Sequence, residues 1–297
     1  MSSTENNNAD QKQENCFTND DGLKIFCKDW GEAASISNPR CLVFIAHGLG
    51  EHCLWYDQLA EELTKRQVYV FSHDHIGHGQ SEGDRVHINN FKQYTRDVFY
   101  HVELKKKKFS NIPVFMIGHS MGGAMAILCA LERPEFFKGI ILIAPAIIVS
   151  PAAVSPLKVF IGRWLSYVFP QLPIAKLDPK AVCRDPNVVK KYEDDPLVYH
   201  GGIKVKLGTQ LLDSMDYICA NLEKLEVPFL ALHGDKDTLA EVDGSKQLGE
   251  KAKSKDKTLK IYEGYYHQLH NEPDDDGVGG TGIRAEIVKW IVERMPA

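Results

Sequence analysis

The residue whose type and spacing first indicate chemistry is Ser120, which has Gly118 and Gly122 two positions away on either side. The apolar residues 114–117 before it are strand-like, and the small and apolar residues 123–128 after it are typical of a helix. A strand that turns sharply into a helix lifts the serine hydroxyl out of the chain, and a side chain at either glycine would obstruct that turn. Ser120 is therefore predicted to be the nucleophile of an acyl-transfer reaction.

A serine hydroxyl is a weak nucleophile at neutral pH, so it needs a histidine to accept its proton and an acid to orient that histidine. In hydrolases with a strand–turn–helix nucleophile, the acid and then the histidine follow the serine along the chain. Asp237 follows the strand-like run 229–234, and His267 follows the strand-like run 259–264. Because active sites of parallel sheets lie beyond the carboxyl ends of the strands, we expect these residues to meet Ser120 at one edge.

Other acids and histidines lie close to both predicted partners. Asp235 and Asp243 flank Asp237, and His270 follows His267. The spacing favours Asp237 and His267, but on sequence grounds these neighbours remain alternatives. A single aspartate or histidine after a strand is usually a turn or cap residue. Three suitable residues in the right order, each beyond its own strand, are harder to explain by coincidence.

Acyl transfer passes through a tetrahedral intermediate whose negative oxygen must meet positioned N–H groups. The glycine-containing loop 47–52 follows an apolar strand and allows backbone amides to approach a ligand. We predict that the N–H groups of Leu49 and of Met121, the residue after the nucleophile, form this oxyanion hole.

Short apolar runs alternate with longer amphipathic ones along most of the chain, which predicts strands joined by crossover helices. The predicted strands are residues 42–46, 68–72, 114–117, 139–143, 229–232 and 258–262. The predicted helices are residues 56–66, 91–105, 123–131 and 283–294. The expected fold class is α/β, with a mostly parallel central sheet flanked by helices. Residues of about 146–225 break the alternation and are expected to form a helical cap over the sheet.

Domain organisation follows from length and composition. A chain of 297 residues with 43% hydrophobic content can bury one large core. Residues 1–15 contain few apolar side chains and are expected to form a disordered tail, followed by a single domain over residues 16–297. Within the cap, residues 154–169 are apolar on most helical faces. Such a helix either covers the core or forms a lid that faces lipid or an oily substrate, and the two roles are compatible.

The charge and cysteine content exclude several classes of function. A net charge of -5 implies no nucleic-acid partner, and the basic run 105–108 is expected to complement a helix C-terminus in solvent. The 7 cysteines are odd in number and lack CxxC spacing, which predicts reduced thiols and a cytoplasmic setting. The tail resembles neither a signal peptide nor an anchor, and no apolar run is long enough to span a bilayer.

No cofactor is expected. His73, His75 and His78 lie close together, but the glycines between them indicate a tight loop of hydrogen-bonding histidines rather than a metal site. The chain has neither the GxGxxG nor the GxxxxGK nucleotide-binding pattern. Cys53, beside the predicted oxyanion loop, is either a reactive thiol or a buried inert one, and burial is the commoner state.

Four segments resemble the monoglyceride lipase family of the α/β-hydrolase fold: residues 47–52, 73–83, 118–123 and 257–264. The likeness extends from about residue 17 to residue 294. The resemblance implies the triad Ser120, Asp237 and His267, and oxyanion amides at Leu49 and Met121. It also implies that the glycerol end of a substrate is contacted by three polar side chains, those of Glu51, Tyr192 and His270.

The chain departs from this family at a few positions. Trp55 stands where some relatives have a basic residue near the glycerol headgroup. Tyr199, Lys206 and Ala240 stand where vertebrate relatives have cysteines near the site.

The resulting hypothesis is a cofactor-free serine esterase that cleaves monoacylglycerol to a fatty acid and glycerol through an acyl-enzyme. The alternatives are a lysophospholipase or general carboxylesterase with the same triad, and a catalytically silent ligand-binding protein, which would usually lack a triad member. Epoxide and haloalkane hydrolysis would need an aspartate in place of Ser120. The expected partners are a lipid substrate and, through the cap, the surface of intracellular membranes, with the protein a monomer or homodimer.

Overall fold

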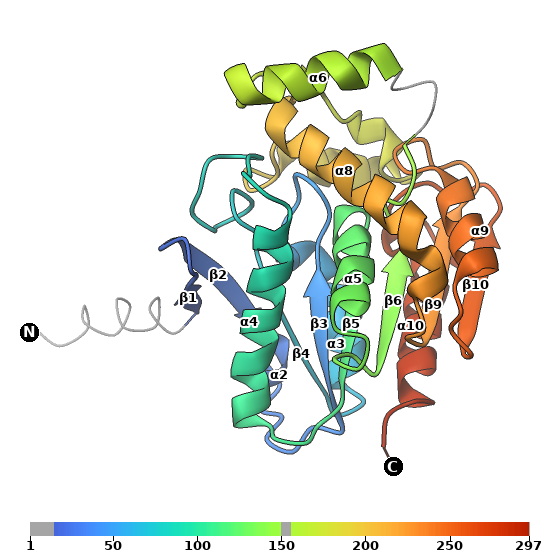
Figure 1. Cartoon of the computed structure of the whole chain (residues 1–297). Coiled ribbons are helices and arrows are strands. Elements are labelled where there is room, and N and C mark those ends of the chain that lie inside the picture. The colour runs from blue at the N-terminus through green and yellow to red at the C-terminus, as the bar shows by residue number, and fades with distance from the viewer. Residues whose placement is uncertain (1–14, 150–155, 297) are drawn as a thin grey trace, which may run out of the picture.

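The computed structural model describes residues 15–149 and 156–296, and its centre is an eight-stranded sheet in the order β1-β2-β4-β3-β5-β6-β9-β10 (Figure 1). The strands are β1 (Cys16–Thr18), β2 (Lys24–Asp29), β3 (Cys41–Ala46), β4 (Val68–His73), β5 (Val114–His119), β6 (Gly139–Ile143), β9 (Phe229–Gly234) and β10 (Lys257–Tyr262). The six strands from β3 to β10 in this sheet pair in parallel. The predicted mostly parallel α/β sheet is therefore confirmed, and several strands extend a residue or two beyond the predicted ends.

The sequence patterns did not reveal the two antiparallel strands β1 and β2, which form one edge of the sheet. In β2, the buried positions Ile25 and Cys27 alternate with positions that are partly or fully exposed, whereas most of the predicted strands are continuous apolar runs. An edge strand keeps one face toward solvent, so its sequence carries only half of the apolar signal of a central strand.

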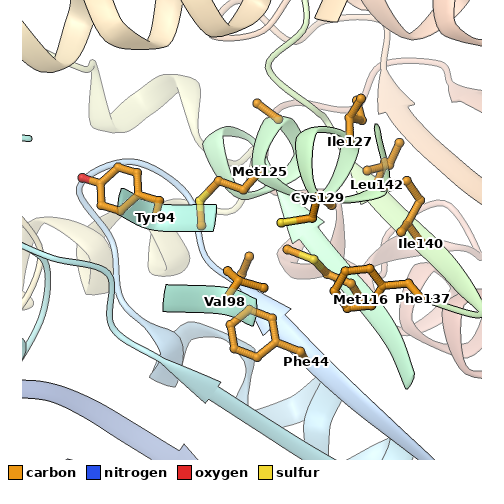
Figure 2. Packing of buried hydrophobic residues seen from close by; sticks show 14 of the residues in the cluster. Phe44, Tyr94, Val98, Met116, Met125, Ile127, Cys129, Phe137, Ile140 and Leu142 are labelled. Carbon is orange, nitrogen blue, oxygen red and sulfur yellow. The ribbon is translucent and has the colours of Figure 1, made fainter. Parts of the chain in front are cut away.

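Helices cover both faces of the sheet. One face carries α4 (Lys92–Lys108), α5 (Met121–Glu132) and α9 (Val242–Lys251), and the other carries α2 (Trp30–Ala33), α3 (Asp57–Thr64) and α10 (Gly279–Val292). Alternate residues of β3 pack into the two layers: Phe44 joins the first core and Val43 the second. Figure 2 shows Met125 and Cys129 of α5 in the first core, near Met116 of β5.

Helices α4 and α10 have bounds that differ from the prediction, and outside the cap the helices α2 and α9 were not predicted. Helix α4 continues through the basic run to Lys108, and Lys105 forms an ion pair of 2.8 Å with Asp29. Helix α10 begins at Gly279 and ends at Val292, a shift toward the N-terminus. The sequence patterns missed α9, because Gly244 and Gly249 lower the helical propensity of this short segment.

The cap lies between β6 and β9, as expected, and covers the carboxyl ends of the parallel strands (Figure 1). It contains α6 (Pro156–Val168), β7 (Pro173–Ala175), α7 (Pro186–Asp194), β8 (Ile203–Lys204) and α8 (Val205–Asn221), and short 3-10 turns occur at Cys53–Tyr56, Pro179–Ala181, Leu222–Lys224 and Leu269–Asn271. The antiparallel pairing of β7 with β8 was not expected from the sequence. The predicted start of the cap helix at Val154, and the tail apart from Asn15, lie outside the described residues.

Candidate active site

Ser120 occupies the sharp turn between β5 and α5, as predicted. Its backbone has φ 54° and ψ -117°, a conformation that is costly for a residue with a side chain. The turn is closely packed, because a Cβ atom at Gly118 would lie 2.2 Å from the Gly122 carbonyl oxygen, and one at Gly122 would lie 2.1 Å from that of Ala46. The two glycines therefore allow the strand, the turn and the helix to approach one another.

The structure brings His267 and Asp237 together beyond the ends of β10 and β9. Nδ1 of His267 lies 2.7 Å from Oδ2 of Asp237. The other carboxylate oxygen accepts backbone hydrogen bonds from Leu239 at 2.8 Å and Ala240 at 3.1 Å. The Asp237 side chain is fully buried, so these donors replace the water that a carboxylate would otherwise require.

The alternative residues occupy other environments. Asp235 accepts a backbone hydrogen bond from Gly264 at 2.6 Å, which ties the loop after β9 to the loop after β10. Asp243 is at the surface and pairs with Lys246 at 2.8 Å. His270 stacks on the ring of Tyr56, with 4.9 Å between the ring centroids. Of the three aspartates considered, it is Asp237 that contacts His267.

Burial and charge set the protonation states of this pair. Burial opposes ionisation of Asp237, but His267 and His233 outweigh it and hold the pKa of the carboxyl group well below its ordinary value. Burial also lowers the pKa of His267 below 6.5, against the opposing influence of Asp237. At neutral pH the pair therefore consists of a carboxylate and a neutral imidazole, which is the state that a general base requires.

Leu49 and Met121 line the same cavity as Ser120 and His267. Met121 is the first residue of α5, so its N–H has no acceptor within the helix and lies at the positive end of the helix dipole. The loop that carries Leu49 is held from the cap, because the Tyr199 N–H donates to the Gly50 carbonyl at 2.7 Å. Both amides thus lie in elements that are fixed from outside the cavity.

Glu51 anchors the same loop through hydrogen bonds of its buried carboxylate. Its Oε1 atom accepts hydrogen bonds from the Gly48 N–H at 2.6 Å and from the Tyr56 hydroxyl, and lies 3.0 Å from Nδ1 of His119. Its Oε2 atom accepts from Nε2 of Gln268 at 3.0 Å. Burial disfavours the Glu51 carboxylate, but these neighbours outweigh that effect and hold its pKa well below the ordinary value.

A cavity of about 560 Å³ extends from this network to the cap. Its polar end contains Glu51, Tyr192 and Gln268, with Ser120 and His267 beside them. Its other end is apolar and is formed by residues of α6, α8 and the connecting segments: Ile161, Leu165, Ile174, Leu177, Ile203, Leu211, Leu212 and Met215. The lining of the cavity thus combines a small polar group of side chains with a larger apolar set, and Ser120 is part of the same lining.

The three side chains expected at the glycerol end are placed differently from one another. Glu51 and Tyr192 line the cavity, whereas His270 is buried behind Tyr56 and is not among the described lining residues. Burial lowers the pKa of His270 to about 3, so its ring is neutral at physiological pH. Gln268, which the sequence patterns did not single out, lines the cavity; its position next to His267 is the one signal that could have indicated it.

Helix α6 has an inner and an outer apolar face. Gly162 and Leu165 line the cavity, while Trp164 is 60% exposed and Tyr167 is 82% exposed. Phe169, just after the helix, is 58% exposed. A helix that covers an apolar cavity and also exposes large aromatic side chains combines the two roles expected from its sequence. In the described part of the chain, no helix is both long and apolar enough to cross a membrane.

The clustered histidines and Cys53 have structural surroundings. The His75 ring stacks on His47 with 3.9 Å between centroids, and the described residues contain no group of three or more side chains that could hold a metal ion. Cys53 is fully buried, and burial raises its pKa well above the ordinary value, so its thiol is protonated. Trp55 is also buried, with the Lys191 ammonium 4.7 Å from its ring centroid.

The fold and the arrangement around Ser120 define a serine hydrolase of the α/β-hydrolase fold. The family model described as serine aminopeptidase, S33, matches residues 37–274. The chain is 42% identical to human (Homo sapiens) monoglyceride lipase over 278 residues, covering 94% of this chain and 90% of that protein. The monoglyceride lipase of Rattus norvegicus is 41% identical over 279 residues, covering 94% and 90% respectively.

A solved structure extends this similarity to three dimensions. The crystal structure of Paleococcus ferrophilus monoacylglycerol lipase matches with a TM-score of 0.81 and 32% sequence identity, covering 91% of this chain and 99% of that one. The chain therefore belongs to the S33 family of serine hydrolases and, within it, to the monoglyceride lipases. The resemblance stated from the four sequence segments is confirmed.

Proposed function

We propose that this protein hydrolyses monoacylglycerol to a fatty acid and glycerol, with Ser120 as nucleophile, His267 as general base and Asp237 as the acid that orients it. The observation that carries the proposal is the lining of the cavity, which brings Ser120 together with a small polar set of side chains and a larger apolar set. A monoacylglycerol has the same division, with a glycerol headgroup on one side of its ester and an acyl chain on the other.

In acylation, His267 accepts the hydroxyl proton of Ser120 as the serine oxygen bonds to the ester carbon. The carbonyl electron pair moves onto oxygen, and the N–H groups of Leu49 and Met121 stabilise this charge. Asp237 stabilises the imidazolium without accepting its proton, which agrees with the low pKa of this carboxyl group. The carbonyl then re-forms, the bond to the glycerol oxygen breaks, and His267 gives its proton to the departing glycerol.

Deacylation repeats these steps with water. His267 accepts a proton from a water molecule, whose oxygen bonds to the acyl carbon of the Ser120 ester. The same two amides stabilise the second oxyanion, and its collapse breaks the bond to Ser120. His267 returns a proton to the serine oxygen, so the free enzyme and a fatty acid are formed.

Glu51 and Tyr192 are proposed to contact the glycerol hydroxyls. Oε1 of Glu51 is occupied by protein donors, but among the described residues Oε2 has a single donor, Gln268, and so retains capacity for a hydroxyl. Tyr192 lines the same cavity. We propose that His270 acts indirectly, by packing against Tyr56, which in turn donates to Glu51.

A lysophospholipid fits the polar end less well than glycerol does. Its headgroup carries a phosphodiester, which proteins usually bind with arginine or lysine. Among the described residues that line the cavity none is a lysine or arginine, and the polar end holds the carboxylate of Glu51. Repulsion between this carboxylate and the phosphate, and the lack of a cation to offset it, favour the uncharged headgroup.

The exposed apolar face of the cap supports a proposal of peripheral membrane contact, through which a lipid substrate would enter. Trp164, Tyr167 and Phe169 present aromatic rings of the kind that enter the membrane interface. The compartment proposed is the cytoplasm, because all 7 cysteines are free and most are buried. We also propose that the protein is a monomer or a homodimer. Light scattering, which measures its molar mass in solution, distinguishes the two states.

The test of the proposed function is a product-release assay across monoacylglycerols and lysophosphatidylcholines matched in acyl chain. We expect release of fatty acid from monoacylglycerol at least about tenfold faster than from the lysophospholipid, the size of effect that one unpaired charge produces. A fluorophosphonate probe should label wild type and fail to label Ser120→Ala. Faster turnover of the lysophospholipid would refute the substrate proposal, and a folded but unlabelled wild type would refute the mechanism.

A further inference from the structure

A second histidine contacts the carboxylate of Asp237. His233, in β9, is fully buried, and its Nε2 atom lies 3.3 Å from Oδ2 of Asp237 and 3.0 Å from the carbonyl oxygen of Ala240. Its Nδ1 atom lies 2.7 Å from the hydroxyl oxygen of Ser245 in α9, which is also fully buried. The proposed mechanism uses neither His233 nor Ser245.

The partners of this ring fix the position of its proton. A carboxylate oxygen and a carbonyl oxygen both accept hydrogen bonds, so Nε2 of His233 must carry a hydrogen. In the neutral ring Nδ1 is then an acceptor, and the Ser245 hydroxyl donates to it. Ser245 therefore selects the His233 tautomer that presents an N–H to Asp237.

We propose that His233 and Ser245 are positioning residues for acyl transfer, with Ser245 fixing the His233 tautomer and His233 holding the Asp237 carboxylate toward His267. This inference rests on the proposed roles of Asp237 and His267. Neither positioning residue is among the described residues that line the cavity, so both act through Asp237.

Hydrogen bonds around the loop after β9 form a closed network. The Ala240 N–H donates to Oδ1 of Asp237 at 3.1 Å, and the Ala240 carbonyl accepts from His233. Oδ2 of Asp237 faces both His267, at 2.7 Å, and His233. Removal of the His233 N–H would free one end of this loop and leave Oδ2 with a single partner, so that the carboxylate could rotate away from His267.

A direction for the pH dependence follows from charge. The His233 N–H stabilises negative charge on the Asp237 oxygen that faces His267, which weakens the attraction of this carboxylate for a proton on the imidazole. Burial is the main cause of the lowered pKa of His267; Asp237 opposes it, and His119 and His233 act in the same direction as burial. Loss of the N–H should therefore raise the pKa of His267. As the pH is lowered, the variant should then lose activity at a higher pH than wild type does.

The test uses the full chain and a soluble ester, p-nitrophenyl butyrate, with kcat and KM measured as a function of pH. For His233→Phe we expect kcat to fall about 10- to 100-fold, as for loss of a hydrogen bond to a charged group, with little change in KM. The acidic limb of kcat/KM should move to higher pH. Ser245→Ala should shift the limb in the same direction with a smaller loss.

His233→Gln is the rescue variant, because its amide nitrogen can donate to Asp237, and it should keep the acidic limb at the wild-type position. The matched control is His101→Phe, which replaces another fully buried histidine, on α4, and should leave the limb unmoved. A folded His233→Phe enzyme with an unmoved limb would overturn the proposal. If that variant does not fold, an unmoved limb in Ser245→Ala has the same meaning.

These readouts are independent of the natural substrate. Wild type that cleaves the chromogenic ester but not monoacylglycerol would overturn the proposed function, while the comparison of variants would still decide the roles of His233 and Ser245. Equal defects in His233→Gln and His233→Phe would count against the hydrogen bond as the cause.

Discussion

Oε1 of the buried Glu51 carboxylate lies 2.6 Å from the backbone nitrogen of Gly48, at the start of the loop that carries the Leu49 amide. A charged acceptor beneath a glycine-containing loop restricts the directions in which the following N–H groups can point. Glu51 therefore links the polar end of the cavity to the proposed oxyanion hole, and a change at this residue should affect both.

Glu51→Gln tests this link. The amide keeps the shape of the side chain but loses the charge that attracts Gly48 and Tyr56, so we expect kcat to fall about 10- to 100-fold. The loss should be similar for monoacylglycerol and for p-nitrophenyl butyrate, because the second ester also needs the oxyanion hole. A loss limited to monoacylglycerol, seen as a higher KM, would show instead that Glu51 only contacts glycerol.

Ser120→Ala should abolish turnover while leaving the fold intact. The substitution removes the nucleophile, and we expect kcat to fall by at least about 10⁴-fold. Because alanine and serine have similar strain at φ 54°, the melting temperature should stay close to that of wild type. Fatty-acid release and thermal unfolding are measured on the same preparation, and substantial residual turnover would identify a different nucleophile.

Gly122→Ala should destabilise the turn that presents Ser120. A Cβ atom at this position would lie 2.1 Å from the carbonyl oxygen of Ala46, so β3 and α5 must separate. Overpacking of this kind costs about 1–3 kcal/mol of the free energy of unfolding, and activity should fall further because the nucleophile moves.

Gly162→Ala provides the control for that substitution. Gly162 lies in α6, and among the described side chains the nearest, Thr209, would be 3.8 Å from the added Cβ atom, which is ordinary contact. Alanine in a helix should be neutral or stabilising by up to about 1 kcal/mol. Both free energies are obtained from urea unfolding, and equal destabilisation by the two substitutions would contradict the packing argument.

The activity should persist at mildly acidic pH. His267 must be neutral to accept the serine proton, and burial holds its pKa below 6.5. The acidic limb of kcat/KM should therefore be centred below pH 6.5, at the pKa of His267, since the protonated ring cannot act as a base. An acidic limb centred above pH 7 would show that Asp237 outweighs burial.

Stability should decline over the same acidic range, which requires a control. Burial lowers the pKa values of His47, His73, His75 and His101 well below 6.5, so these rings take up protons more readily in the unfolded state. Below the unfolded pKa of about 6.5, protonation therefore favours unfolding, and the melting temperature should fall. Recovery of full activity after return to neutral pH separates titration of His267 from loss of the fold.

The outer face of α6 should contribute to membrane binding. Substituting both Trp164 and Phe169 with aspartate removes two exposed aromatic rings, and we expect the affinity for phosphatidylcholine vesicles to fall at least about tenfold. Turnover of p-nitrophenyl butyrate should change little, because the substituted side chains are on the outer face of the cap. Tyr100→Asp, which alters an exposed aromatic residue on α4, is the control, and equal co-sedimentation of all variants would contradict the proposal.

The sequence alone determined the chemistry and the central sheet. The parallel strands β3, β4, β5, β6 and β9 are buried on both faces and are largely apolar runs, whereas β10, at the edge of the sheet, is partly exposed. The proposed nucleophile, acid and histidine follow β5, β9 and β10. The order of Ser120, Asp237 and His267 therefore carried information about their positions, because the carboxyl ends of parallel strands meet at one edge. The apolar pattern of residues 154–169 similarly indicated a cap helix, although not which of its faces lines the cavity.

Tertiary structure decided which polar side chains support those residues. Glu51 meets His119 and Gln268 only after strands and loops distant in the chain have packed together, and His233 meets Ser245 only when α9 packs against β9. The choice of Asp237 over Asp235 depends on how the loops after β9 and β10 dock, which no local pattern specifies. Apolar periodicity is a local property and can be read along the chain, whereas a buried hydrogen bond depends on the meeting of two distant segments and becomes visible only in the fold.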